Sequence, residues 1–120
     1  MPDSEPHAIE IAPFGGRVRV RLGGAIVADS AHAMMLEETG FPPVFYLPRG
    51  DVRMEHLMPS ARRSHCPHKG DASYFNLEAG GRSAPDAAWS YETPYPIAAA
   101  IAGHIAFYEG KVEIETVPFG

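Results

Sequence analysis

The sequence predicts a single, mainly β domain of antiparallel strands and hairpins, barrel-like or arranged as a folded sheet, with one or two short helices. Glycine and proline are frequent, at 12 residues each among 120, and they divide the chain into many short segments. Both residues interrupt helices and are typical of turns between strands. Several segments also alternate polar and apolar side chains, which is the period of a half-buried strand.

The clearest hairpin is expected near the N-terminus. Residues 17–22 alternate arginine with valine or leucine, so one face of this strand is charged and the other is apolar. Gly23-Gly24 follows, and two glycines readily take the positive φ angles of a two-residue hairpin turn. The return strand is then residues 25–28, in a register that places Val20 opposite Val27.

A second hairpin is expected at the C-terminus, around a turn at Glu109-Gly110. Its two strands place apolar residues opposite each other on one face and polar residues on the other. The predicted pairs are Phe107 with Val112 and Ile105 with Ile114 on the apolar face, and His104 with Glu115 and Tyr108 with Lys111 on the solvent face.

Three further strands are expected between the hairpins. Residues 44–47 form a short apolar run bounded by prolines, which favours a position near the edge of a sheet. Residues 71–77 and residues 87–92 form the other two strands. In the last of these, Trp89 and Tyr91 project to the same face because side chains alternate along a strand.

Helical patterns are limited to two short segments. Residues 51–58 end before Pro59, and residues 96–102 begin with a proline, which suits the first position of a helix. Residues 31–38 contain helix-favouring side chains but are too short to decide between helix and strand. A glycine-rich loop is expected at residues 78–85.

Length and charge limit the classes of protein to consider. A chain of 120 residues can bury one core without disulfides, so residues 1–120 are expected to form one domain, with residues 1–14 loosely ordered. The net charge of −5 argues against a nucleic-acid partner. The first ten residues lack the apolar block of a signal peptide, and no apolar stretch reaches the ~20 residues of a membrane span. We therefore expect a cytoplasmic protein with no membrane partner.

The densest cluster of reactive side chains is the segment Ser64–Gly70, which contains the only cysteine, Cys66. A thiol is a nucleophile as the thiolate, and Lys69 with the neighbouring arginines and histidines favours that form. A tight turn brings the Lys69 ammonium and backbone N–H groups toward one small volume, where an anionic ligand can sit. The alternative is that Cys66 is a packed small residue and Lys69 a solvated turn residue.

Other residues can complete a pocket around Cys66 and Lys69. Glu37 follows an apolar run and is a candidate general base or ligand acceptor, although a surface carboxylate at the end of an element is its ordinary role. Trp89 is expected to be buried beside the pocket. Four aromatic side chains on predicted strands are expected to form a wall that stacks against a flat ligand: Tyr46, Tyr74, Trp89 and Tyr91.

A metal site is another interpretation of the same segment, with His65, Cys66 and His68 joined by His56 or Glu37. It is disfavoured because adjacent His65 and Cys66 point to opposite sides of an extended chain, and because no second cysteine is present. We therefore expect no metal, and the sequence does not indicate a cofactor.

Residues from about Arg17 to Val117 resemble one family. They are Ala28-Asp29-Ser30, Glu37, Pro43, Tyr46, Pro48, Asp51, Leu57, Cys66-Pro67, Lys69-Gly70, Ala72, Tyr74, Trp89, Tyr91, Pro94, Ile101 and Ala106-Phe107-Tyr108. This pattern is similar to a small family of domains of unknown function that is sometimes labelled nucleotidyltransferase-like. The resemblance implies a compact, mainly antiparallel β domain without an established role. The candidate site residues that match its pattern are Cys66, Lys69, Glu37, Tyr46, Asp51, Tyr74, Trp89 and Tyr91.

Three functions follow from these observations. In the first, a pocket binds a small anionic or carbonyl ligand: Lys69 holds an oxygen, Cys66 is a nucleophile or polar contact, and Glu37 orients or deprotonates. In the second, the Cys-Pro-x-Lys-Gly turn is a structural corner of a non-catalytic protein-interaction module. The third is nucleotidyl transfer, whose Mg²⁺ chemistry needs two close carboxylates, whereas Asp29 and Asp51 are isolated in the sequence.

Overall fold

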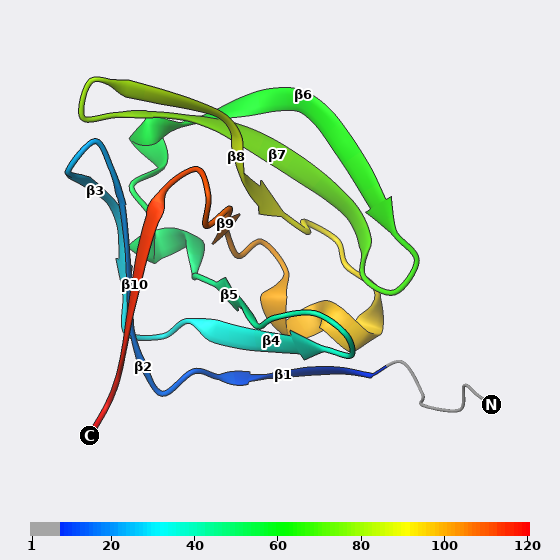
Figure 1. The fold of residues 1–120 in the computed structure, drawn as a ribbon. Coiled ribbons are helices and arrows are strands. Elements are labelled where there is room, and N and C mark those ends of the chain that lie inside the picture. Colours follow the sequence, from blue (N-terminus) through cyan, green and yellow to red (C-terminus); the bar gives the residue numbers. More distant parts are fainter. Residues whose placement is uncertain (1–7) are drawn as a thin grey trace.

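Three antiparallel sheets surround a common interior in the computed structural model, which describes residues 8–120 (Figure 1). The first sheet contains β1 (Ile9–Pro13), β4 (Met34–Glu38) and β5 (Val44–Tyr46). The second contains β10 (Glu113–Pro118), β2 (Gly16–Leu22) and β3 (Ala25–Ser30). The third contains β6 (Leu57–Cys66), β7 (Gly70–Ala79), β8 (Arg82–Ser90) and β9 (Ala106–Phe107).

The mainly β prediction is confirmed, although the described strands do not close into a barrel. In Figure 1, β6, β7 and β8 arch over the interior, β1 and β4 lie below it, and the sheet of β2, β3 and β10 stands at one side. Two isolated bridges, Ala28 with Val52 and Leu47 with Ile105, connect the sheets to the segments between them. The three sheets therefore form one folded β domain.

Within residues 8–120, the helical content is three short 3₁₀ helices: η1 (Arg49–Asp51), η2 (Met54–His56) and η3 (Pro96–Ile101). The helix expected at residues 96–102 is confirmed as η3, which begins with Pro96. The single helix expected at residues 51–58 is wrong. Between η1 and η2 the chain is extended, because Val52 bridges β3 and the Arg53 N–H donates to the Val27 carbonyl at 2.8 Å.

The Gly23-Gly24 hairpin is confirmed, with φ angles of 58° and 81° at the two glycines. Its predicted register is wrong in one detail, because Val20 lies opposite Ala28 rather than Val27. A β-bulge between Val20 and Arg21 changes the register. The extra residue lets Val27 and Ala28 both be buried, which a regular alternating strand does not allow.

The C-terminal hairpin is wrong. Phe107 in β9 pairs with Ala88 of β8, and Ile105 bridges Leu47. Beyond the turn, β10 crosses to the edge of β2, where Ile114 lies opposite Val20 (Figure 1). The alternating face of β2 provides a longer apolar partner for β10 than the two-residue β9 does, so the non-local pairing forms.

The structure corrects the prediction for two shorter segments and decides a third that the sequence left open between helix and strand. Residues 78–85, expected as a loop, are the end of β7, a two-residue turn at Gly80-Gly81 and the start of β8, with Glu78 paired to Ser83. Residues 31–38 contain strand β4, which resolves the ambiguity in that segment. Part of the N-terminal segment expected to be loosely ordered is β1, which pairs with β4, and residues 1–7 lie outside the described residues. The edge strand expected at residues 44–47 and the strand at 71–77 are confirmed as β5 and β7.

The buried residues form two clusters. The larger one lies between β2–β3 and β7–β8 and includes Val18, Val20 and Leu77. The smaller one lies below β7 and β8 against η3, and it includes Tyr46 and Tyr91. This second cluster is rich in tyrosine, and it forms the base of the pocket described below.

The glycine turns of the β2–β3 hairpin and the β7–β8 hairpin pack backbone against backbone. A Cβ atom at Gly23 would lie 2.5 Å from the Gly80 carbonyl oxygen, and a Cβ atom at Gly80 would lie closer still to the Gly23 carbonyl oxygen. Gly81, in the same turn as Gly80, also has a positive φ angle but faces open space. The Gly80 contact is therefore a packing constraint as well as a conformational one.

We predict that Gly80→Ala lowers the free energy of unfolding by about 2 kcal/mol more than Gly81→Ala does. Both substitutions meet the same left-handed backbone, but only alanine at position 80 collides with Gly23. Urea denaturation of the two variants measures the difference. Equal destabilisation would show that the two turns do not pack together in solution.

Candidate functional site

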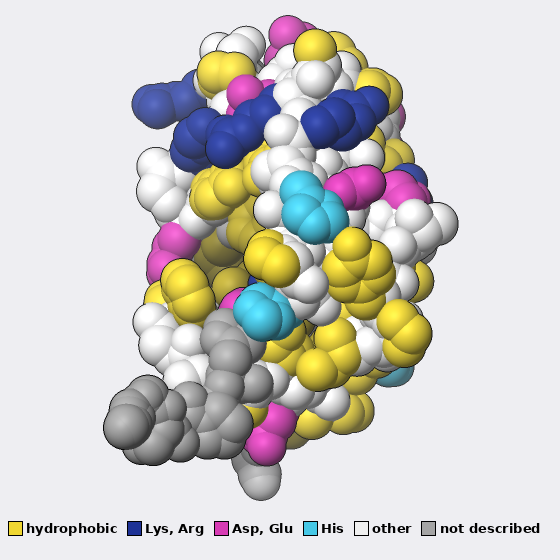
Figure 2. All heavy atoms as spheres, turned by 90° about the vertical axis from the view of Figure 1, so that its right-hand side faces the viewer, with side chains coloured by type: hydrophobic (Ala, Val, Ile, Leu, Met, Phe, Trp, Pro, Cys, Tyr) yellow, Lys and Arg dark blue, Asp and Glu magenta, His cyan; other side chains and the backbone are white. Residues whose placement is uncertain are grey.

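A pocket of about 280 Å³ lies between the end of β4, strand β5 and the inner face of β7–β8. Figure 2 shows the corresponding side of the molecule, which is hollowed between hydrophobic side chains below a group of lysine and arginine side chains. The lining residues are Leu36, Glu38, Phe41, Pro42, Val44, Tyr46, Cys66, Lys69, Tyr74, Trp89, Tyr91 and Tyr108. We call this the aromatic pocket.

An ion pair between Lys69 and Glu38 is the charged feature of the aromatic pocket. Lys69 Nζ donates to Glu38 Oε1 at 2.8 Å, and the two side chains are only 10% and 11% exposed. Lys69 comes from the β6–β7 turn, whereas Glu38 ends β4. Because charges are costly to remove from water, a nearly buried pair of this kind requires close mutual contact.

Backbone hydrogen bonds hold the β6–β7 turn in place. The Lys69 N–H donates to the Cys66 carbonyl at 3.2 Å, and the Tyr95 N–H donates to the Lys69 carbonyl at 2.9 Å. Gly70 follows with a φ angle of 111°, which a side chain rarely permits. The turn thereby presents the half-buried Cys66 thiol and the buried Lys69 ammonium to the same pocket.

The aromatic side chains form a connected wall. Trp89 Nε1 donates to the Tyr46 hydroxyl at 3.2 Å, and the Trp89 ring lies 4.4 Å from the Tyr108 ring. Tyr108 stacks with Tyr74 at an interplanar angle of 9°. On the other side, Lys69 Nζ lies 5.9 Å from the centroid of Tyr91. The wall therefore offers flat apolar surfaces close to one ammonium group.

The hydroxyl groups of Tyr46, Tyr91 and Tyr108 remain neutral at physiological pH. Burial raises the pKa of Tyr46 and the pKa of Tyr91 well above the ordinary value. Burial, assisted by the neighbouring Tyr74, raises the pKa of Tyr108 to about 12. These groups therefore act as neutral hydrogen-bond donors and acceptors, and the Lys69–Glu38 pair carries the charge inside the pocket.

Two facing β-bulges shape the outer edge of the pocket. The register shifts between Pro59 and Arg63 in β6, and β8 shifts opposite Phe75–Leu77. Ser60 Oγ donates to Asp86 across these bulges. The β6 bulge directs Arg62 over the ring of Tyr74, with its guanidinium carbon 4.5 Å from the ring centroid. An exposed cation thus lies beside an aromatic wall of the pocket.

The structure brings most of the predicted site residues together. Cys66, Lys69, Tyr46, Tyr74, Trp89 and Tyr91 all line the aromatic pocket. Trp89 is half-buried there. Glu37 lies elsewhere: it is exposed and does not line the pocket, and Glu38 occupies the expected position of the carboxylate. The reason is strand alternation in β4, which places Leu36 and Glu38 on the pocket face and Glu37 on the other face.

Asp51 is also outside the aromatic pocket. Its Oδ2 accepts a hydrogen bond of 2.6 Å from Ser30 Oγ, and the same Ser30 Oγ accepts from the His32 N–H. Asp51 therefore fixes the end of β3 against η1. Asp29 is separately paired with Arg17 and Arg19, and the hydrogen bond from Arg17 lowers the pKa of Asp29.

Sequence reasoning missed several lining residues. Tyr108 was expected on the solvent face of a C-terminal hairpin, and Glu38 was passed over in favour of its neighbour. Phe41 and Pro42 lie in the β4–β5 loop, where an aromatic residue beside two prolines in a predicted connection is a signal for an exposed binding surface. Arg62 does not line the pocket, and its position over Tyr74 depends on the β6 bulge, a property of the assembled sheet that no local pattern reports.

Metal-ligand clusters and membrane-spanning helices are both absent from the part of the chain that the structure describes. Within residues 8–120, no three His, Cys, Asp or Glu side chains gather closely enough to hold a metal ion. Within the same range, no helix has the length and apolar character needed to cross a bilayer.

We predict that the Lys69–Glu38 pair is strongly coupled. Lys69→Met and Glu38→Leu each lower the free energy of unfolding by about 3 kcal/mol, because each leaves the opposite charge buried. The double variant loses much less than the sum of the two single losses. Denaturant unfolding of the four proteins in the cycle measures this coupling.

The matched control is the surface pair of Arg21 and Glu115, whose side chains are 32% and 53% exposed. Glu115→Leu lowers the free energy of unfolding by less than about 1 kcal/mol. Similar losses at the two pairs, or additive effects at Lys69 and Glu38, would contradict a buried ion pair.

The comparison with known families agrees with the resemblance seen in the sequence. The sequence profile of a domain of unknown function, DUF427, matches residues 10–118, which is nearly the whole chain. A search of curated proteins found no match. The predicted membership in a small family of unknown function is therefore confirmed, and the chain belongs to the DUF427 family.

Proposed function

We propose that the aromatic pocket binds a small, flat organic ligand through a carboxylate or carbonyl oxygen. The observation that carries the proposal is the nearly buried Lys69 ammonium, which lies at the edge of a pocket walled by one tryptophan and four tyrosines. Sites for small molecules are typically concave and apolar, with a few convergent polar groups that fix orientation.

Lys69 supplies the contact that selects an oxygen. An ammonium group has three N–H bonds, and Glu38 accepts one of them. A ligand oxygen accepts another, and the low polarity of the surroundings strengthens that hydrogen bond. Glu38 keeps the unliganded ammonium compensated, so the free pocket does not contain an isolated buried charge.

The aromatic wall supplies the contact area. Trp89 and Tyr108 lie 4.4 Å apart as tilted rings, and Tyr74 stacks beside Tyr108. A planar ligand gains dispersion and hydrophobic energy against such faces. The neutral hydroxyls beside them offer further hydrogen bonds without repelling an anion.

Cys66 is positioned to act as a nucleophile on a ligand bound in the aromatic pocket. Its thiol lines the same pocket as Lys69 and Glu38. With a carbonyl oxygen held by Lys69, Cys66 Sγ forms a bond to the carbonyl carbon and its proton passes to Glu38, which takes the role expected of Glu37. The π electrons of the C=O bond move to the oxygen, where the Lys69 ammonium stabilises the negative charge. Binding is the primary proposal, and this nucleophilic step is its extension.

A second candidate function is a protein-interaction surface. Phe41, Tyr95 and Ile97 are large apolar side chains that are exposed on this molecule. In this alternative the β6–β7 turn is a structural corner and the pocket is incidental. The binding experiments below separate the two, because a corner has no reason to select an oxygen-bearing small molecule.

We predict that benzoate and benzamide bind and change the fluorescence of Trp89, whereas benzylamine does not. Trp89 is the only tryptophan in the chain and lines the pocket, so its emission reports occupancy directly. Benzylamine has the same ring but presents a cation to Lys69. Fluorescence titration measures the three affinities.

Lys69→Met in the Glu38→Leu background is the test variant, because it removes both charges of the buried pair together. It loses benzoate binding. Arg53→Met, at an exposed arginine that does not line the aromatic pocket, keeps it. The proposal would be overturned if the test variant bound benzoate as tightly as the wild type, or if the wild type bound benzoate and benzylamine equally.

We predict that iodoacetamide modifies Cys66 in the folded protein and that benzoate slows this reaction. The thiol is half-buried in the pocket wall, so a bound ligand restricts access to it. Intact-mass spectrometry follows the single alkylation. The urea-unfolded protein is the control, in which benzoate has no effect. Equal rates with and without benzoate in the folded protein would separate Cys66 from the ligand site.

A further inference from the structure

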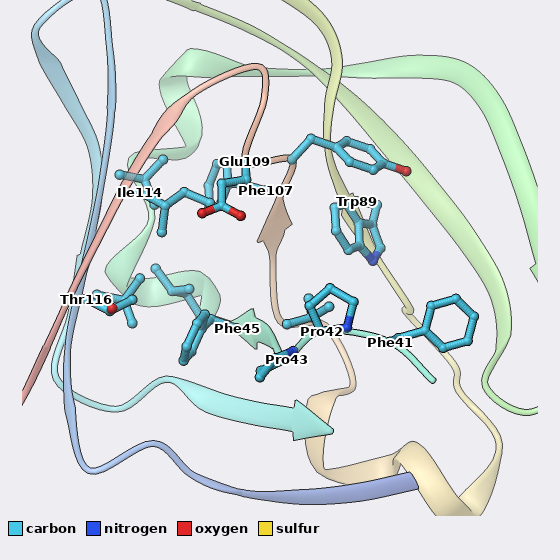
Figure 3. A pocket seen from close by; sticks show the side chains of 14 residues that line it. Phe41, Pro42, Pro43, Phe45, Trp89, Phe107, Glu109, Ile114 and Thr116 are labelled. Carbon is cyan, nitrogen blue, oxygen red and sulfur yellow. The ribbon is translucent and has the colours of Figure 1, made fainter. Parts of the chain in front are cut away.

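A second pocket adjoins the aromatic pocket and is nearly all apolar. It encloses about 380 Å³ between β2 and β10 on one side and β5 and β9 on the other. Val18 and Val20 of β2, Phe45 of β5, Phe107 of β9 and Ile114 of β10 are among its lining residues. We call this the apolar pocket (Figure 3).

The two pockets share part of their walls. Five residues line both of them: Phe41, Pro42, Val44, Trp89 and Tyr108. In Figure 3, Trp89 and Phe41 lie at one end of the apolar pocket and Ile114 and Thr116 at the other. Lys69, Glu38 and Cys66 line the aromatic pocket alone. The Lys69–Glu38 ion pair and the Cys66 thiol therefore lie at one end of the joined pockets, and mainly apolar side chains, with Thr116, lie at the other end.

We propose that the two pockets form one elongated site for an amphipathic small molecule, with an oxygen-bearing head at Lys69 and an aliphatic chain in the apolar pocket. This inference rests on the proposed function and names the class of ligand. The head pairs with the ammonium, while the chain passes between Trp89 and Phe41 toward Ile114 and Thr116.

The chemistry of the apolar pocket favours an uncharged chain over a second polar group. Glu109 is the single charged residue among those lining it, and it is acidic. A second anionic group, such as a phosphate, would meet that carboxylate and no cation in this pocket. Burial of methylene groups against valine, proline and phenylalanine is favourable for an aliphatic chain.

The exposure of Phe41 is consistent with this arrangement. Its side chain is 64% exposed although it lines both pockets, and it lies in the β4–β5 loop next to Pro42 and Pro43. A chain that crosses the boundary between the pockets contacts this ring. The contact buries apolar surface that water otherwise covers in the free protein.

The test is a series of linear carboxylates, from butanoate through hexanoate and octanoate to decanoate, titrated against Trp89 fluorescence with benzoate as the reference ligand. Each methylene group buried in the apolar pocket strengthens binding about fourfold. Trp89 lies at the boundary of the two pockets and reports both classes of ligand.

Thr116→Phe is the test variant, because position 116 lines the far end of the apolar pocket and a larger side chain fills it. In this variant the affinity for the carboxylates no longer rises with chain length, while the affinity for benzoate is unchanged. Val117→Phe adds similar bulk to the next residue of β10, which does not line the apolar pocket, and leaves the series unchanged. If Thr116→Phe does not fold, Thr116→Leu adds less volume at the same position.

The elongated site is overturned if the affinity does not rise with chain length, or if Thr116→Phe leaves the affinity for octanoate unchanged. In either case, benzoate binding still supports the proposed function. The proposed function itself is overturned if neither benzoate nor any carboxylate of the series shows binding that depends on Lys69.

Discussion

The contact on which the site depends is the ion pair between Lys69 and Glu38. It joins the β6–β7 turn of one sheet to the end of β4 in another, at 2.8 Å and with both side chains nearly buried. A buried ion pair contributes little net stability relative to an apolar contact of the same shape, but it demands one geometry. It therefore fixes where Cys66 and the aromatic wall lie relative to β4, and it keeps the pocket electrically neutral before any ligand arrives.

Burial gives the tyrosines around this ion pair two roles. Removal from water packs Tyr46 and Tyr91 into the smaller core and also keeps their hydroxyls neutral, since burial raises the pKa of each. The rings of Tyr46 and Tyr91 thus stabilise the fold through the smaller buried cluster, and both residues also line the pocket. The half-buried Trp89 and Tyr108 sit where the aromatic and apolar pockets meet, so core and binding surface are continuous rather than separate layers.

The sequence predicted what depends on local pattern. Strict alternation and the Gly23-Gly24 pair were sufficient for the first hairpin, and Pro96 was sufficient for η3. The C-terminal hairpin failed because β10 pairs with β2, a partner about ninety residues earlier, and no local pattern reports such a choice. The aromatic pocket was predictable in its residue types. Glu37 was expected instead of Glu38, because Met34-Met35-Leu36 shows no alternation that would reveal which face of β4 is inward.

The same geometry bears on nucleotidyl transfer, which the family label suggests. That chemistry is usually built on two carboxylates close enough to share Mg²⁺ ions. Asp29 is bound by two arginines at the charged face of β2–β3, whereas the adjacent Ser30 side chain turns inward and donates to Asp51. Successive residues of a strand point to opposite faces, so Asp29 and Asp51 are directed to opposite sides of β3. Each carboxylate holds the fold at its own position, and neither lines the aromatic pocket, where Lys69 and Glu38 lie beside the tyrosine hydroxyls.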